Sequence, residues 1–365
     1  MRKITVGLEG AEYPILIDES WSEQFGEKIK QYLPKCDRVM VVTNADIGRH
    51  YLAPLQKSLK AADFAVETTE LPEGESEKTV ATTHLIWDSL IAHGFTRQSA
   101  LVALGGGVVG DITGFAAACY MRGVDFIQAP TSLLAMVDSS VGGKTGVNHP
   151  LAKNIIGAFW QPKAVLMDLS VLQTLPVEEF RSGLAEVIKH GVIRDAEYFD
   201  YVEANLDGIL ELDGNRMSHV VAGSCKIKSA VVAEDEKEHG LRAILNFGHT
   251  VGHAIENLVE YGNLRHGECV SIGMIAATRI AEKMELVDTA LRPRLAGLLM
   301  QCKLPVTIPE LEVSAIMEKL KSDKKVRDGK VRFVLPVQMG EVTIRDDVPE
   351  ATISEVLCEM GASNE

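Results

Sequence analysis

The segment around residues 246–268 concentrates side chains that can hold a metal ion. His249 and His253 are four residues apart, which places them on one face of a helix, and His266 follows shortly after. Neutral imidazoles at this spacing readily coordinate zinc, and spacing alone favours His249 and His253 as a ligand pair. A metalloprotease helix is disfavoured, because Thr250 stands where its H-E-x-x-H motif has glutamate.

A carboxylate would complete an open catalytic metal site. Glu186 lies in the largely apolar segment 182–190, where an unpaired charge is costly. Two interpretations stay open at this point: Glu186 is a metal ligand, or it forms a buried ion pair, for example with Lys189. His190 is either a further ligand or an ordinary core histidine.

A second group of residues resembles a phosphate-binding turn. The apolar stretch 101–104 leads into Gly105, Gly107 and Gly110, a G-x-G-x-x-G pattern that lets backbone N–H groups and a helix N-terminus approach a pyrophosphate. The usual acidic residue about twenty positions later is missing or displaced, so a glycine turn that only packs a strand against a helix is the alternative. The glycine pair before Lys144 predicts a second anion-binding loop.

Charge limits the class of partner. The chain has 51 acidic and 37 basic side chains, a net charge of −14, which argues against a nucleic-acid surface. Cationic and polar groups nevertheless gather near both motifs: Arg122, Lys144, Lys153 and Asn154 near the glycines, and Lys228 and Arg242 near the histidines. We expect a small anionic substrate that carries a phosphate or carboxylate.

The elements that must position these groups follow from hydrophobic patterning. Residues 3–17 predict a hairpin, and strands at 38–43 and 64–68 alternate with helices at 49–61 and 80–93. This alternation predicts an α/β domain with a mostly parallel sheet, whose ligands gather at the carboxyl ends of the strands. The polar or glycine residues at those ends are Asn44, Glu75, Lys78, Gly105 and Thr131.

The second half has a different pattern. Helical periodicity dominates from 178 to 320, followed by a small hairpin at 331–344 and a final helix near 353–360. We therefore predict a nucleotide-binding α/β domain at 1–177 and a mostly α-helical, metal- and substrate-binding domain at 178–365, and the resemblance described below makes the nucleotide NAD. With no apolar signal region and no long uncharged run, we expect a cytoplasmic protein that does not enter a membrane. Six scattered cysteines predict buried thiols, without a disulfide framework.

Together, these motifs resemble the 3-dehydroquinate synthase family of sugar phosphate cyclases. The similarity runs in order through nearly the whole chain, in segments 72–75 with Lys78, 105–111, 130–148, 153–154, 159–162, 185–189, 245–250, 266–268 and 323–325. It implies conversion of 3-deoxy-D-arabino-heptulosonate 7-phosphate to 3-dehydroquinate and phosphate in the shikimate pathway, through transient oxidation by NAD, phosphate elimination, reduction and aldol closure. It also implies a divalent metal, Zn²⁺ or Co²⁺, and a homodimer.

The resemblance assigns roles residue by residue. It gives the metal to Glu186, His249 and His266, and it moves His253 to a polar substrate or proton-relay role. It places NAD against Asn44, Glu75, Lys78, Gly105, Gly106, Gly107, Val108, Val109, Gly110, Asp111, Thr131, Ser132, Lys144, Lys153 and the stretch around Thr174. It places the sugar-acid phosphate against Arg122, Asp138, Lys144, Asn154, Lys189, Lys228, Arg242, Asn246 and Lys325 or its neighbour Lys324, with Asp138 positioning a hydroxyl or Lys144.

Two departures and three alternatives accompany the resemblance. Asn44 and Asp46 stand where the family pattern has Asp and Asn, and Ser132 replaces a threonine, although hydrogen-bonding capacity is kept. The alternatives are a cyclase for a neutral sugar phosphate, a metal-dependent polyol dehydrogenase, and a non-catalytic NAD-binding module with a structural zinc. The last is disfavoured, because a structural zinc site is closed by four protein ligands and the sequence offers three.

Overall fold

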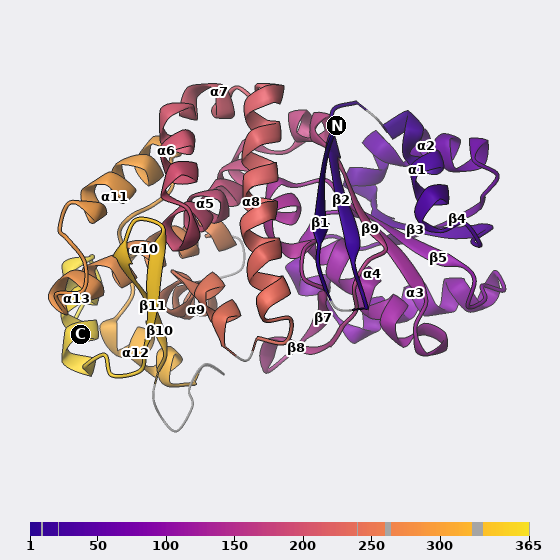
Figure 1. Cartoon of the computed structure of the whole chain (residues 1–365). Coiled ribbons are helices and arrows are strands. Elements are labelled where there is room, and N and C mark those ends of the chain that lie inside the picture. Colours follow the sequence, from indigo (N-terminus) through magenta and orange to yellow (C-terminus); the bar gives the residue numbers. More distant parts are fainter. Residues whose placement is uncertain (9, 21, 239, 260–263, 323–330, 365) are drawn as a thin grey trace. The chain divides into compact units, whose positions relative to one another are not determined.

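In the computed structural model the chain forms two compact units (Figure 1). The first unit comprises residues 1–175 and 214–237, and the second comprises 176–213 and 238–365. The structure describes residues 1–8, 10–20, 22–238, 240–259, 264–322 and 331–364. The predicted domain boundary at residue 177 lies close to residue 175, where the chain first passes from the first unit to the second. The prediction places residues 214–237 in the second domain, whereas the structure places them in the first unit.

A sheet forms the centre of the first unit. Its described strands are β1 (Arg2–Val6), β2 (Tyr13–Asp18), β3 (Arg38–Asn44), β4 (Ala65–Leu71), β5 (Ala100–Gly105), β6 (Asp125–Pro130) and β9 (Ala164–Asp168). Their order is β1-β2-β9-β6-β5-β3-β4. The pair β1 and β2 is antiparallel, and all other neighbours are parallel. The predicted N-terminal hairpin and mostly parallel sheet are therefore confirmed.

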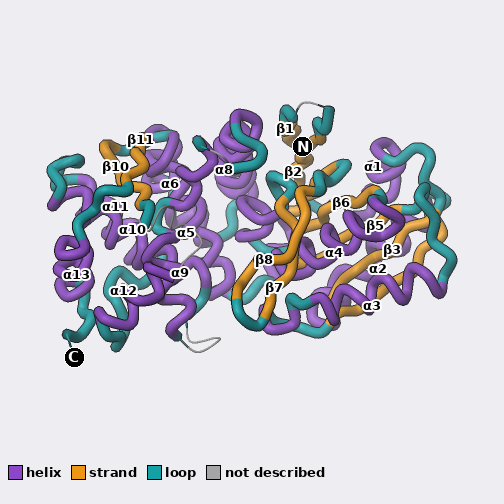
Figure 2. Tube along the Cα trace, turned by 90° about the horizontal axis from the view of Figure 1, so that it is seen from below, coloured by secondary structure: helices purple, strands orange, loops and turns teal. Residues whose placement is uncertain are grey.

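Helices cover both faces of this sheet because the central strands are apolar on both faces. Val39 and Val41 of β3 share a core with α1 (Phe25–Tyr32) and α2 (Ala45–Ala61). Met40 and Val42 belong to a second core with α3 (Val80–Ala92) and α4 (Gly107–Cys119). Successive side chains of a strand point to opposite faces, so one apolar run fills both cores. Figure 1 shows β3 and β5 between α1 and α2 on one side and α3 and α4 on the other, and Figure 2 draws the strands in orange and the helices in purple.

Two further elements complete the first unit. The hairpin of β7 (Lys144–His149) and β8 (Ala152–Phe159) occupies the segment in which the glycine pattern predicts an anion-binding loop. Gly142 and Gly143 form a turn into β7, and the N–H of Gly142 donates to the hydroxyl of Tyr13 at 3.0 Å, so this backbone donor is already occupied. The long helix α8 (Gly214–Glu234) packs against β1 and β2.

The second unit is mostly helical, as predicted. Its helices are α5 (Val177–Arg194), α6 (Ala196–Ala204), α7 (Leu206–Leu210), α9 (His249–Leu258), α10 (His266–Lys283), α11 (Leu291–Gln301), α12 (Val313–Ser322) and α13 (Glu350–Glu359). The predicted hairpin is formed by β10 (Phe333–Gln338) and β11 (Glu341–Arg345). Helix α10 packs against α5, α9, α11 and α13. Within the described residues, none of the helices has the length and apolar character that crossing a bilayer requires.

All six cysteines are free thiols. Cys36, Cys225, Cys269 and Cys302 are buried, as predicted, whereas Cys119 is exposed. Burial raises the pKa of Cys225 to about 12. Such a thiol is inert at neutral pH, because the thiolate is the reactive form.

Glycines bring the backbones of α9 and α10 into contact. A Cβ on Gly273 would overlap the carbonyl oxygen of Gly248, and a Cβ on Gly252 would lie 2.8 Å from the carbonyl oxygen of Cys269. Gly248 also has a φ of 78°, in the left-handed region that favours glycine. This close approach sets how near the histidines of α9 come to His266 at the start of α10.

Replacing Gly273 should weaken this contact. We expect Gly273→Ala to lower the free energy of unfolding by about 1–3 kcal/mol, because the new methyl group has no space against a backbone carbonyl. Urea unfolding followed by circular dichroism measures the change. The matched control is Gly297→Ala in α11, where a Cβ meets nothing within 4 Å; it should raise stability by roughly 0.5–1 kcal/mol through helix propensity. Equal changes in both variants would contradict the packing argument.

Candidate active site

The predicted cofactor residues of the first unit lie where the strand order reverses. The chain passes from β3 to β4 on one side and returns to β5 on the other side of β3. The paired strands β3 and β5 run in register, with Val42 opposite Ala103, and end at Asn44 and Gly105. Dinucleotides bind at this kind of switch point in open α/β sheets.

The glycine run 105–110 contains the start of α4 and glycines that pack closely against neighbouring side chains. Gly106 is the N-cap residue of α4, so the free N–H groups of the first helical turn lie at the carboxyl end of β5. A Cβ on Gly107 would lie 3.1 Å from Ser139 Oγ, and one on Gly110 would lie 2.8 Å from Gln128 Oε1 on β6. The third glycine therefore packs helix against strand, which is its role in dinucleotide-binding turns.

Lys78 is the centre of a buried polar network next to this turn. Its ammonium group lies 2.6 Å from Asp111 Oδ2 and 2.6 Å from Asn154 Oδ1, and Lys78 is only 5% exposed. Burial raises the pKa of Asp111 above its ordinary value, although the charge of Lys78 and its hydrogen bond act to lower it. The structure thus brings together three predicted residues from separate segments.

Asn148, to which the sequence motifs assign no role, completes this network. Its side-chain N–H donates to Glu75 Oε1 at 2.8 Å, and its Oδ1 accepts the backbone N–H of Asn154 at 2.7 Å. Its own backbone N–H donates to the carbonyl of Lys78 at 2.7 Å. Asn148 of β7 therefore ties the segment 75–78 to the β7–β8 hairpin, and Asn154 of β8 has a φ of 51°. A strained backbone in such a place is typical of binding sites.

Other predicted residues of the first unit also have defined partners. Asn44 caps α2 by accepting the N–H of Ile47 at 2.9 Å, and Ser132 Oγ accepts the N–H of Ala135 at 3.2 Å. Thr174 contacts the hydroxyl of Tyr51. The described residues also outline an apolar pocket at the carboxyl ends of β5, β6 and β9, lined by Phe25, Tyr51, Leu55, Leu104, Ala129, Pro130, Thr131, Leu166, Asp168 and Val171.

Asp138 has a cationic partner within the same unit. Lys228 of α8 forms an ion pair with its carboxylate and donates to its backbone carbonyl at 2.7 Å. Lys228 is 6% exposed. Of the other predicted cations, Lys144 begins β7 and is exposed, and Lys153 is partly buried. Arg122 is exposed and has a φ of 67° after Met121 at 49°.

In the second unit, Glu186 lies beside two of the histidines. Its Oε1 is 3.5 Å from His249 Nε2 and 3.8 Å from His266 Nε2, and the residue has no exposed surface. Two donors at zinc-bonding distance in a tetrahedral site are separated by about 3.3 Å. Glu186 Oε1 accepts no hydrogen bond from the described residues, so a cation is the kind of partner that this oxygen fits.

The sequence leaves two interpretations of Glu186 open, a metal ligand or a buried ion pair with Lys189, and each has a matching contact in the structure. Its Oε2 forms an ion pair with the buried Lys189, while its Oε1 faces the histidines. His249 Nδ1 lies 3.0 Å from the carbonyl oxygen of Phe247. A carbonyl can only accept, so Nδ1 carries the hydrogen and Nε2 keeps the lone pair that a metal requires.

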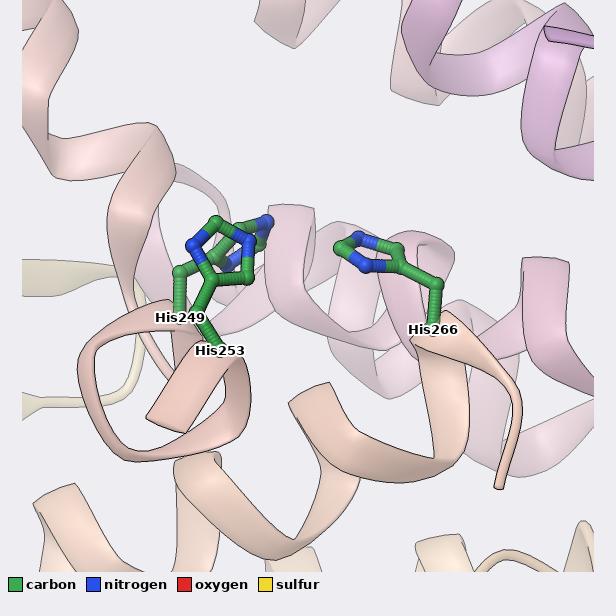
Figure 3. Close-up of side chains that lie close together, drawn as sticks. All are labelled: His249, His253 and His266. Carbon is green, nitrogen blue, oxygen red and sulfur yellow. The ribbon is translucent and has the colours of Figure 1, made fainter. Parts of the chain in front are cut away.

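His253 lies in the same cluster. Its ring centroid is 5.1 Å from that of His249 and 5.7 Å from that of His266, and the three imidazoles are close enough to hold one ion (Figure 3). The ligand pair expected from spacing and the set implied by the resemblance therefore both gather here. His190 is buried in α5. Arg242 is buried, and Asn246 donates to Glu238 Oε1 at 3.0 Å. Lys324 and Lys325 lie outside the described residues.

Comparison with known proteins covers both units. Residues 68–182 match the family model of the 3-dehydroquinate synthase N-terminal region, and residues 183–326 match that of the C-terminal region. The chain is 50% identical to a 3-dehydroquinate synthase of Synechococcus sp. over 97% of this chain and 98% of that protein. It is 45% identical to one of Shewanella sp. over 98% of this chain and 99% of that protein.

Solved structures of related cyclases have the same fold. One is 2-epi-5-epi-valiolone synthase from Streptomyces hygroscopicus with NAD⁺ and Zn²⁺ bound, with a TM-score of 0.87 at 27% identity, covering 95% of this chain and 96% of that one. Another is 2-deoxy-scyllo-inosose synthase with carbaglucose-6-phosphate, NAD⁺ and Co²⁺, with a TM-score of 0.89 at 25% identity over 98% and 100% of the two chains. From the family models and the full-length relatives, we conclude that this chain belongs to the 3-dehydroquinate synthase family.

Proposed function

We propose that the chain converts 3-deoxy-D-arabino-heptulosonate 7-phosphate to 3-dehydroquinate and phosphate, the reaction of its family. The observation that carries this proposal is the group formed by buried Glu186 with His249 and His266, within a chain about half identical to 3-dehydroquinate synthases over nearly its full length. The other cyclases of this fold are more distant in sequence, at 25–27% identity. The family match therefore favours the carboxylate-bearing substrate.

NAD and a divalent metal are the cofactors. NAD supplies a hydride acceptor that is regenerated within the reaction, and the metal supplies a Lewis acid for substrate oxygens. We propose that the first turn of α4 binds the pyrophosphate, since its free N–H groups follow the glycines at the switch point. The apolar pocket beside Thr131 and Val171 accepts the adenine ring. Glu186, His249 and His266 hold the metal.

Buried cations are suited to a substrate with several anionic groups. Arg242, Lys189 and Lys228 are each 6% exposed or less. A buried guanidinium binds a carboxylate or phosphate through two parallel hydrogen bonds, so Arg242 is the group best suited to an anionic end of the substrate. Arg122, Asp138, Lys144, Asn154 and Asn246 supply further polar contacts to hydroxyl and phosphate oxygens.

His253 is suited to moving a proton. It is partly exposed and lies beside His249 and His266, and imidazole changes charge near neutral pH. We assign its ring nitrogens to proton transfer at a substrate hydroxyl rather than to the metal, because three protein ligands leave metal positions open for substrate.

We also propose a homodimer in the cytoplasm. The chain carries exposed apolar side chains on the β7–β8 hairpin, with Leu151, Ile155 and Phe159 at 88%, 51% and 45% exposure, which a second copy can cover. Sedimentation equilibrium would give twice the chain mass of 39.7 kDa for a dimer, and the single chain mass would refute it.

The decisive assay measures phosphate release and NADH in parallel. With 3-deoxy-D-arabino-heptulosonate 7-phosphate, NAD and zinc, we expect one phosphate per 3-dehydroquinate, no accumulation of absorbance at 340 nm, and loss of turnover after chelation. NAD is regenerated in each cycle, so net NADH should not form. Net NADH formation with simple polyols and no phosphate release would identify a dehydrogenase instead. Turnover of a heptulose phosphate that lacks the carboxylate would identify a different cyclase.

A conservative change of Glu186 separates the metal site from the NAD site. We expect Glu186→Gln to weaken zinc binding and to abolish turnover, because a neutral amide is a poorer zinc ligand than a carboxylate. NAD binding, measured by titration calorimetry, should change little, since the proposed NAD residues belong to the first unit. The matched control is Glu178→Gln, an exposed position on the same helix, which should keep both zinc and activity. Retention of both zinc and turnover in Glu186→Gln would show that this ligand assignment is wrong.

A further inference from the structure

Helix α9 presents a third polar side chain on the face that carries its histidines. His249, His253 and Glu256 follow one another at spacings of four and three residues, which places them along one side of the helix. Glu256 Oε2 lies 3.1 Å from His266 Nδ1 at the start of α10. The carboxylate is 19% exposed and the imidazole 28% exposed, so the contact is partly shielded from water.

The chemistry of this contact fixes which nitrogen of His266 can bind a metal. An ionised carboxylate has only acceptor atoms, so Nδ1 must carry the hydrogen that forms the bond. Nε2 then keeps its lone pair, and it is Nε2 that lies 3.8 Å from Glu186 Oε1. His249 reaches the same state through the carbonyl oxygen of Phe247, at 3.0 Å from its Nδ1. His249 is therefore oriented by a backbone carbonyl, whereas His266 is oriented by the side chain of Glu256, which a substitution can remove.

The packing of the two helices brings this pair together. The glycines Gly248, Gly252 and Gly273 let the backbones of α9 and α10 touch, so the last turns of α9 pass beside the first turn of α10. Glu256 lies near the end of α9, and His266 is the first residue of α10. The hydrogen bond is thus set by the helix contact as well as by the side chains.

We propose that Glu256 is a positioning residue of the metal site, which holds His266 in the orientation and tautomer that present Nε2 to the ion. The proposal rests on the proposed ligand set of Glu186, His249 and His266. Carboxylates that accept a hydrogen bond from a metal-binding imidazole raise its basicity and fix its ring, and their loss typically lowers metal affinity about 10–100-fold.

The test measures zinc affinity of the metal-free protein, without turnover. We expect Glu256→Gln to raise the zinc dissociation constant at least about tenfold in competition with a chromophoric chelator. Glu256→Asp keeps the charge but draws the carboxylate back by one methylene, so it should also lose affinity if positioning is the cause. The thermal midpoint of each metal-free variant, followed by circular dichroism, should match that of the unchanged protein.

Two controls separate the possible causes. Glu355→Gln removes an equal charge at an exposed position of α13, where Glu355 contacts Lys283, and it should leave zinc affinity unchanged. His266→Ala tests the ligand set itself and should lose zinc affinity. The role of Glu256 is refuted if Glu256→Gln binds zinc within twofold of the unchanged protein. It is also refuted if Glu256→Asp keeps full affinity, or if affinity falls only together with the thermal midpoint. If His266→Ala also binds zinc normally, the ligand set fails as well.

Discussion

A fully buried carboxylate is the constraint on which the second unit depends. Glu186 has no exposed surface, and an isolated ionised carboxylate in such a place would cost several kcal/mol or would take up a proton. Three side chains lie against this carboxylate and offset the cost of burying it. They are Lys189 from the same helix, and His249 and His266 from two other helices. These histidines can converge only because glycines bring their helices into backbone contact. The packing of α9 against α10 therefore sets how closely the side chains of the candidate metal site approach one another.

Much of the first unit is predictable because its signals are local. The apolar run of β3 fills two cores at once, and strands that alternate with helices indicate a parallel sheet. The β7–β8 hairpin is harder to predict. Gly146 and Gly157 lie opposite each other, and glycine is rare in strands, so the pattern indicates a loop. These glycines have a packing reason that appears only in three dimensions, since a Cβ on either would overlap the partner strand.

The candidate site likewise has residues that the sequence predicts and contacts that only the structure shows. The sequence, through its resemblance to the family, predicts Lys78, Asp111 and Asn154 as site residues, but the hydrogen bonds of Lys78 to the other two depend on tertiary structure. Asn148 has no spacing signal of its own, and its partner Glu75 is far away in sequence. Glu256 lies at helical spacing from His253, but its partner His266 is on another helix. Helical spacing predicts His249 and His253 as ligands, and both lie close enough to His266 to hold one ion with it, while Glu186 lies beside His249 and His266. Spacing along one helix carries no information about a ligand that comes from another.

Helix α8 has a consequence for how the chain is made. The first unit uses residues 1–175 and then 214–237, so the chain leaves this unit and returns to it. During synthesis the N-terminal segment emerges first, yet the partner of Asp138 and the helix that covers β1 and β2 are still to be translated. Domains usually fold as units on the ribosome, N-terminal first. Here residues 176–213 of the second unit are translated before the last segment of the first unit. A fragment that ends near residue 175 would lack α8, a helix that belongs to the first unit.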